Sequence, residues 1–178
     1  MNIPDFKDSF ISDKDIFYYP NSVIENYKSN INFKKMVTIQ WRKVWPKGRK
    51  NQKRILANGE ELADKLASIL PKNILIRLVD TASLSISEQI SLMRKTDYLV
   101  GIHGAGLCLS VFMPHESIMQ EVLPWNHISV VTLMSALSGH ITYSDLIRSR
   151  NNKSTNISFE PEMFAKRVLD HMLQNNFF

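Results

Sequence analysis

The chain has 178 residues, a formal net charge of +5, 44% hydrophobic residues and 22% charged residues. These proportions are ordinary for a globular protein, and the length predicts about one domain with a single real core. Only 6 Gly and 7 Pro exclude a collagen-like or low-complexity chain, and 1 Cys excludes an internal disulfide framework and a cysteine-based zinc cluster.

No stretch of the sequence predicts a membrane span or a secretory leader. The most apolar stretch, residues 98–114, contains His103 and three glycines. It is shorter than the roughly 20 apolar residues that a transmembrane helix needs. The first ten residues lack a basic start followed by an apolar run, so no signal peptide is visible.

Strand and helix patterns alternate along the chain from Met36 onward. The first 35 residues are rich in Asn, Asp, Lys and Tyr and predict an irregular segment, with a short helix around residues 22–27. Apolar, β-branched runs predict strands over residues 36–41, 74–79, 97–102, 117–123 and 141–143. Helical spacing predicts helices over residues 62–70, 86–93, 107–112 and 128–137, the last of them buried, and one more starting near Pro161 after a polar linker at 144–156.

This alternation predicts a three-layer α/β, Rossmann-like fold with a mainly parallel sheet. We expect an irregular segment over residues 1–35, the nucleotide-binding domain over 36–145, and a linker with a C-terminal helix over 146–178. Ligands of such sheets bind at the carboxyl ends of the strands. The important loops are therefore those after Trp41, Val79, Ile102 and Leu123.

The most informative motif is Gly-Ile-His-Gly-Ala-Gly-Leu at residues 101–107, between a strand and a helix. Gly104 and Gly106 allow a tight turn and a close ligand approach. The amides that open the next helix lack intrahelical partners and carry partial positive charge, which suits phosphate. His103 adds a donor that becomes cationic near neutral pH. A tight structural turn is the alternative.

Two common phosphate-binding loops do not fit this turn. The Walker lysine is absent, and the glycine spacing is the reverse of the dinucleotide fingerprint, so an NAD enzyme is disfavoured. Glu121, at the end of the fourth predicted strand, faces the same crevice, where its carboxylate would accept hydrogen bonds from a ribose diol. The alternative is that Glu121 is an ordinary surface acid at a strand end, without a ligand.

A basic segment, residues 42–54, holds seven cations and no acid. It is either a phosphate-facing loop or a solvated one. RNA binding is less expected, since no aromatic-rich strand motif accompanies the cations. The histidines His115, His140 and His171 show no spacing typical of metal ligands, so we expect no metal site.

The stretch Ser85–Pro124 resembles glycosyltransferase family 61. It contains a helix with Glu-Gln, then Thr-Asp, a Val-Gly strand, His-Gly-Ala-Gly-Leu, Phe-x-Pro and a Glu-x-x-Pro ending, in that order. The family includes the EGF-domain O-GlcNAc transferases, plant β-xylosyltransferases and xylan arabinosyltransferases. Upstream, Trp41-Arg42-Lys43 and the Arg54-Ile55-Leu56 run before Asn58 resemble the family's arginine-containing strand end and its Arg-Ile-x-Asn-Glu helix start. Asn58-Gly59-Glu60 departs from that pattern by one inserted residue.

The resemblance implies a GT-B enzyme with two Rossmann-like halves, of which this chain is the C-terminal, donor-binding half. Such an enzyme would transfer a sugar from a UDP-sugar to a protein glycan or polysaccharide with inversion, and would need no metal or other cofactor. The implied donor-binding residues are Arg42, Arg54, His103, Gly104, Ala105, Gly106 and Glu121. No residue is assigned as the general base. The resemblance also implies the lumen of the Golgi or ER, and a possible N-terminal half as a partner.

Two other functions stay open. The chain could be a nucleotide-sugar-binding remnant without transferase activity. It could also be an unrelated α/β module that binds RNA or a nucleotide, although nucleic acid is an unlikely partner for the reason given above.

Overall fold

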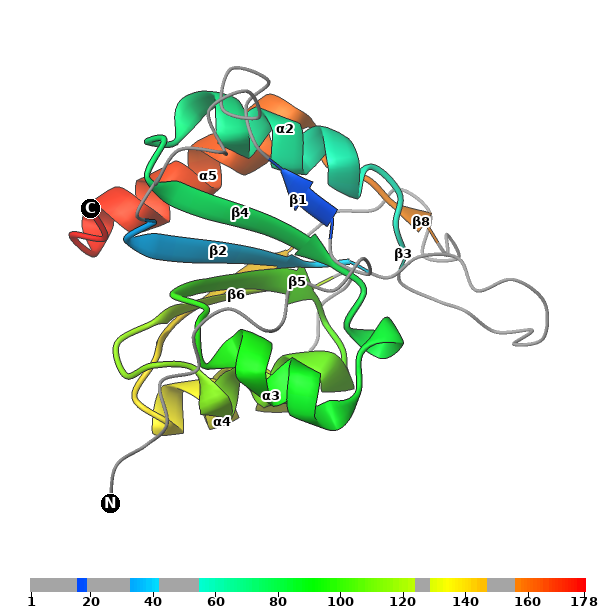
Figure 1. The fold of residues 1–178 in the computed structure, drawn as a ribbon, viewed down its shortest axis with the longest axis vertical. Coiled ribbons are helices and arrows are strands. Elements are labelled where there is room, and N and C mark those ends of the chain that lie inside the picture. The colour runs from blue at the N-terminus through cyan, green and yellow to red at the C-terminus, as the bar shows by residue number, and fades with distance from the viewer. Residues whose placement is uncertain (1–15, 19–32, 42–54, 124–128, 147–155) are drawn as a thin grey trace.

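The computed structural model describes residues 16–18, 33–41, 55–123, 129–146 and 156–178 (Figure 1). The described strands of the main sheet are β1 (Ile16–Tyr18), β2 (Lys35–Gln40), β4 (Ile74–Val79), β5 (Tyr98–Ile102), β6 (Ile118–Leu123) and β7 (Ile141–Leu146). The helices are α2 (Gly59–Ile69), α3 (Ile86–Met93), α4 (Val130–Leu137) and α5 (Pro161–Gln174), with 3₁₀ helices η1 (Thr81–Ser83) and η2 (Ala105–Phe112).

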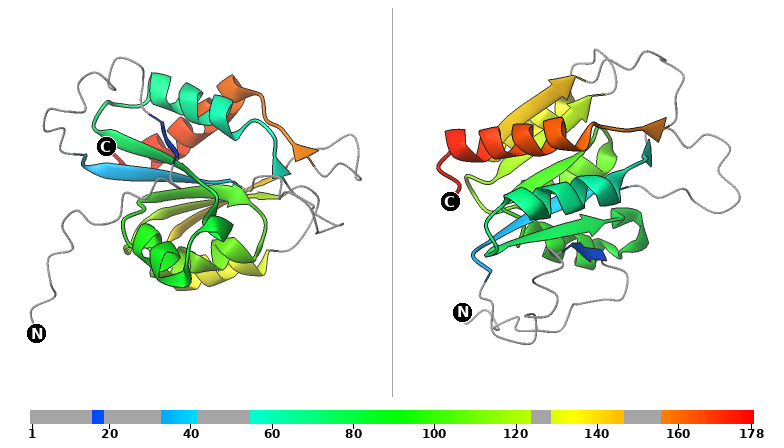
Figure 2. Two further views of the ribbon diagram at one scale, coloured as in Figure 1. Left: turned by 45° about the vertical axis from the view of Figure 1, so that its right-hand side comes forward. Right: turned by 90° about the horizontal axis from the view of Figure 1, so that it is seen from above.

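The main sheet runs in the order β1-β4-β2-β5-β6-β7. Strands β2, β4, β5, β6 and β7 are parallel, and only β1 pairs antiparallel, with β4. Helices α2 and α5 cover one face, and α3, η2 and α4 cover the other (Figures 1 and 2). The predicted three-layer α/β fold with a mainly parallel sheet is therefore confirmed.

The strand order creates a reversal of direction in the middle of the sheet. From β2 the chain passes through α2 to β4 on one side, and then through α3 to β5 on the other side of β2. The connection that leaves the carboxyl end of β2 therefore runs to one side of the sheet, and the connection that leaves β5 runs through η2 to β6 on the other side. In open α/β sheets, ligands bind in the crevice between two such neighbouring strands.

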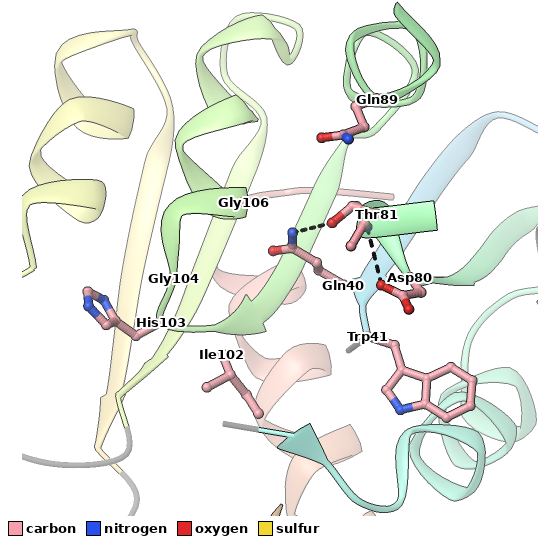
Figure 3. Close-up of a pocket in the computed structure, with 10 residues that line it drawn as sticks. Gln40, Trp41, Asp80, Thr81, Gln89, Ile102, His103, Gly104 and Gly106 are labelled. Atoms are coloured by element: carbon pink, nitrogen blue, oxygen red, sulfur yellow. Dashed lines mark hydrogen bonds between the residues drawn. The ribbon is translucent and has the colours of Figure 1, made fainter. Parts of the chain in front are cut away.

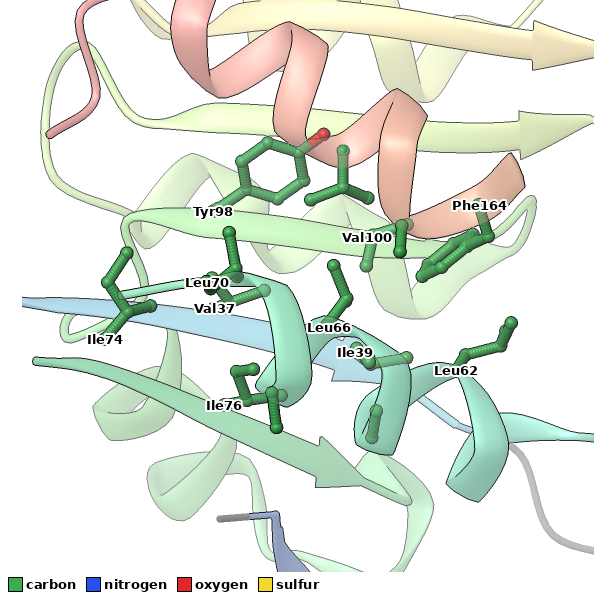
Figure 4. Packing of buried hydrophobic residues seen from close by; sticks show 14 of the residues in the cluster. Val37, Ile39, Leu62, Leu66, Leu70, Ile74, Ile76, Tyr98, Val100 and Phe164 are labelled. Atoms are coloured by element: carbon green, nitrogen blue, oxygen red, sulfur yellow. The ribbon is translucent and has the colours of Figure 1, made fainter. Parts of the chain in front are cut away.

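The larger core lies between the sheet and the pair α2 and α5 (Figure 4). Leu62 and Leu66 are one helical turn apart on α2, and both are fully buried against strand residues such as Ile39 and Ile76. A smaller core lies on the other face, between the sheet and α3, η2 and α4. Helical periodicity thus correctly indicated the inner face of α2.

Helix α5 is fixed to the sheet by a buried polar cluster. The Tyr98 hydroxyl donates to Gln120 Oε1 at 2.7 Å and lies 3.1 Å from Nδ1 of His171. The Tyr143 ring stacks on His171 with a centroid distance of 3.6 Å. Burial raises the pKa of Tyr98 and lowers that of His171, so both groups favour their neutral forms.

Several sequence predictions need correction. Residues 16–18, expected to be irregular, form strand β1, because three strand-favouring side chains are too few to show a period. The expected linker at 144–156 is strand at both ends, since β7 continues to Leu146 and β8 (Asn156–Ile157) pairs with β3 (Ile55–Leu56). The helix expected around residues 22–27 lies outside the described residues. Among the described helices, none is long and apolar enough to cross a membrane.

Helix α4 was expected to be buried, and this was wrong. Its outer side exposes Val130 at 64%, Leu133 at 59% and Leu137 at 80%, whereas Val131 and Ser135 face inward. The sequence of α4 is almost uniformly apolar, so its composition does not distinguish the inner face from the outer one.

Replacing Leu137 on α4 with glutamine should therefore change the free energy of unfolding by no more than about 0.5 kcal/mol. Most of this side chain is already in water. Urea unfolding of the variant and of Val131→Ala, a buried position on the same helix, provides the comparison. A loss of about 2 kcal/mol or more for Leu137→Gln would show that the outer side of α4 is covered.

Candidate functional site

A cavity of about 270 Å³ opens at the carboxyl ends of β2, β4 and β5, where the strand order reverses (Figure 3). Its lining comes from three segments that are far apart in the sequence. The lining residues are Gln40, Trp41, Asp80, Thr81, Ala82, Gln89, Ile102, His103, Gly104 and Gly106. Two of the four loops predicted to matter, those after Val79 and Ile102, therefore contribute to one cavity, together with Gln40 and Trp41 at the end of β2. The loops that follow Trp41 and Leu123 lie outside the described residues.

The glycine turn, residues 103–106, forms one wall of the cavity. Gly104 has an extended backbone, with φ 171° and ψ 163°, and precedes the first residue of η2. The backbone N–H of His103 donates to the Val122 carbonyl at 2.9 Å, which fixes the start of the turn to β6. His103, Gly104 and Gly106 line the cavity, so the turn is placed as the sequence predicted.

The Gln40 side chain approaches Gly106 closely. A Cβ atom at position 106 would overlap the Gln40 amide. That amide donates from Nε2 to Thr81 Oγ1 at 2.7 Å across the cavity (Figure 3). The bond joins the end of β2 to the loop after β4, and the absence of a side chain at Gly106 leaves room for it.

Trp41 and Ile102 supply the apolar part of the lining, and both pack against the larger core. The Trp41 indole N–H donates to the Leu56 carbonyl at 2.9 Å. Trp41 is the described residue before the basic segment 42–54, and this bond joins it to β3, which begins at Ile55 after that segment. Arg42 and Arg54 themselves lie outside the described residues.

Glu121 lies behind His103 and is not part of the lining. Its side chain is fully buried, and Oε1 lies 2.5 Å from His103 Nδ1. Its second oxygen, Oε2, accepts from the Thr132 hydroxyl at 2.5 Å. The structure therefore brings Glu121 to His103, as the strand ends suggested. The predicted contact between Glu121 and a donor ribose stays a prediction.

The sequence model of the glycosyltransferase 61 family matches residues 13–120 of the chain, which is more than half of its length. This chain belongs to glycosyltransferase family 61. The resemblance inferred from the motifs is thereby confirmed, and the domain is a glycosyltransferase domain. No curated protein matches the chain significantly.

The match places the cavity within the family-61 region of the chain. All the lining residues lie between Gln40 and Gly106, inside the matched range, and Glu121 is the first residue after it. The polar residues Gln40, Asp80, Thr81 and Gln89 were not singled out from the sequence. For Asp80 and Thr81 the available signal was their position directly after strand β4.

Asn58 in this family-61 domain makes bonds within the fold. Its amide donates from Nδ2 to the Phe159 carbonyl at 2.7 Å and accepts the Phe159 N–H at 3.2 Å. These two bonds join the start of α2 to the segment between β8 and α5. Asn58 therefore has a structural role, although the residue inserted after it departs from the family's pattern.

Proposed function

We propose that this family-61 domain is the donor-binding half of an inverting GT-B glycosyltransferase, and that the cavity holds the diphosphate of a UDP-sugar. The observation that carries the proposal is the position of the glycine turn. It lies at the reversal between β2 and β5, where nucleotide ligands of such sheets bind.

The chemistry of the lining supports a diphosphate. His103 supplies an imidazole donor, and the turn before η2 supplies backbone N–H groups and leaves space for phosphate oxygens. Arg42 follows Trp41, which lines the cavity, and Arg54 comes two residues before Leu56, whose carbonyl accepts the Trp41 indole N–H. On this ground we assign both arginines to the diphosphate. Ala105 contributes through its backbone amide.

In the proposed reaction an acceptor hydroxyl attacks the anomeric carbon as the bond to the diphosphate oxygen breaks. The acceptor proton passes to a general base that we do not assign. Negative charge grows on the departing diphosphate, where preorganised donors lower the barrier most. His103, the turn amides and the two arginines are the groups in this chain that would stabilise it.

We further propose that the acceptor is a protein-linked glycan or a polysaccharide, and that the protein acts in the lumen of the secretory pathway. Both proposals rest on the family alone. A second half of the GT-B fold would complete the acceptor side of the cleft.

Calorimetric titration of UDP and of uridine tests the diphosphate proposal. We expect UDP to bind at least about 10-fold more tightly, since hydrogen bonds to a charged group contribute about 1.5–3 kcal/mol each. Arg42→Ala and Arg54→Ala should each weaken UDP binding by an amount in that range. Arg94→Ala is the matched control, because Arg94 follows α3 at the opposite end of the strands. Equal affinities for UDP and uridine would refute the phosphate role of the turn.

A further inference from the structure

Glu121 is a buried acid paired with His103, which lines the cavity wall. The Glu121 side chain has 0% exposure, that of His103 has 18%, and the two are joined at 2.5 Å through His103 Nδ1. An ionised carboxylate can only accept hydrogen bonds, so the histidine donates from Nδ1. Because His103 also lines the cavity, its ring connects Glu121 to the space assigned to the donor.

The other carboxylate oxygen is held from the opposite side. The Thr132 hydroxyl of α4 donates to Oε2, and Thr132 Oγ1 is also 3.0 Å from the Ser144 hydroxyl of β7. In the sheet, Glu121 is the direct neighbour of Gly101 in β5 and of Ser144 in β7. Both carboxylate oxygens of Glu121 are therefore held by hydrogen bonds, Oε1 by His103 and Oε2 by Thr132.

A buried carboxylate is costly unless it is paired and hydrogen-bonded. His103 is paired with Glu121 on β6, and Asp80 lines the same cavity as His103. The acid on the neighbouring strand β7, Asp145, pairs with Arg167 and Gln120. The His103 ring and the Thr132 hydroxyl thus supply the hydrogen bonds that Glu121 needs in its buried position.

We propose that Glu121 is a positioning residue that acts on the donor through His103, with Thr132 as the support that holds its carboxylate. The buried acid fixes the orientation of the His103 ring through Nδ1, so that the other ring nitrogen, Nε2, is directed at the diphosphate of the donor. This inference rests on the proposed function, and it assigns to Glu121 an indirect role in place of a contact with the ribose.

The test compares UDP and uridine binding to the wild-type chain and to Glu121→Gln at a single pH. In Glu121→Gln, UDP should bind about 10-fold or more weakly, because the His103 ring loses its fixed orientation, and uridine affinity should be unchanged.

Thr132 gives a second route to the same result if Glu121→Gln does not fold. Thr132→Val removes the hydroxyl and should weaken UDP binding without changing uridine affinity. Thr132→Ser keeps the hydroxyl and should restore the wild-type UDP affinity. An unchanged UDP affinity in Thr132→Val would overturn the supporting role of Thr132.

The outcomes separate the two proposals. If the wild-type chain binds UDP no more tightly than uridine, the diphosphate proposal fails, whatever the result for Glu121→Gln. If the wild type prefers UDP but Glu121→Gln retains the same UDP affinity, only the role of Glu121 is overturned. An equal loss of UDP and uridine affinity in Glu121→Gln would assign Glu121 to the nucleoside and also overturn it.

Discussion

Replacing Gly104 with valine should reduce UDP binding by about 100-fold or more while leaving the fold intact. Gly104 lines the cavity, and its backbone is extended, a conformation that valine adopts without strain. A branched side chain at this position would occupy the space that phosphate oxygens need. Calorimetry with UDP measures the loss, and thermal unfolding checks that the domain remains folded.

A size series at Gly104 provides the control. Gly104→Ala adds a single methyl group and should lose less affinity than Gly104→Val if space in the cavity is the cause. UDP affinity of Gly104→Val within about threefold of the wild type would show that the ligand does not approach this wall.

Replacing Leu66 with alanine should destabilise the domain by about 2–5 kcal/mol. Leu66 is fully buried on the inner face of α2, in the core shared with α5 and the sheet (Figure 4). In a chain of this size, 1 kcal/mol moves the melting temperature by about 2–4 °C, so we expect a fall of roughly 4–20 °C. Differential scanning calorimetry measures it.

Ile69→Ala on the same helix is the matched control. Ile69 is 37% exposed, and it should lose less than half as much stability as Leu66→Ala. Equal losses at the two positions would contradict the assignment of the inner face of α2.

The local patterns in the sequence were enough to predict the layers and the turn. Apolar runs such as Ile74–Val79 and the helical spacing of Leu62 and Leu66 report the environment of each element directly. Because parallel strands present their carboxyl ends at one edge, the end of β2 and the loops after Val79 and Ile102 could also be predicted to converge.

The partners of individual side chains could not be predicted in the same way. The bond between Gln40 and Thr81 and the pairing of Glu121 with Thr132 depend on strand order and on where α4 packs, which are long-range properties. The sequence placed Glu121 at a strand end, but nothing local shows that its carboxylate is buried behind His103.

Backbone amide NMR of the ¹⁵N-labelled chain, titrated with UDP and separately with uridine, tests most directly whether the glycine turn binds the donor diphosphate. We predict that the amide signals of Gly104, Ala105 and Gly106 shift on addition of UDP and shift much less with uridine. Amides of the turn that do not respond to UDP, or that respond equally to uridine, would contradict the assignment of this cavity to the diphosphate.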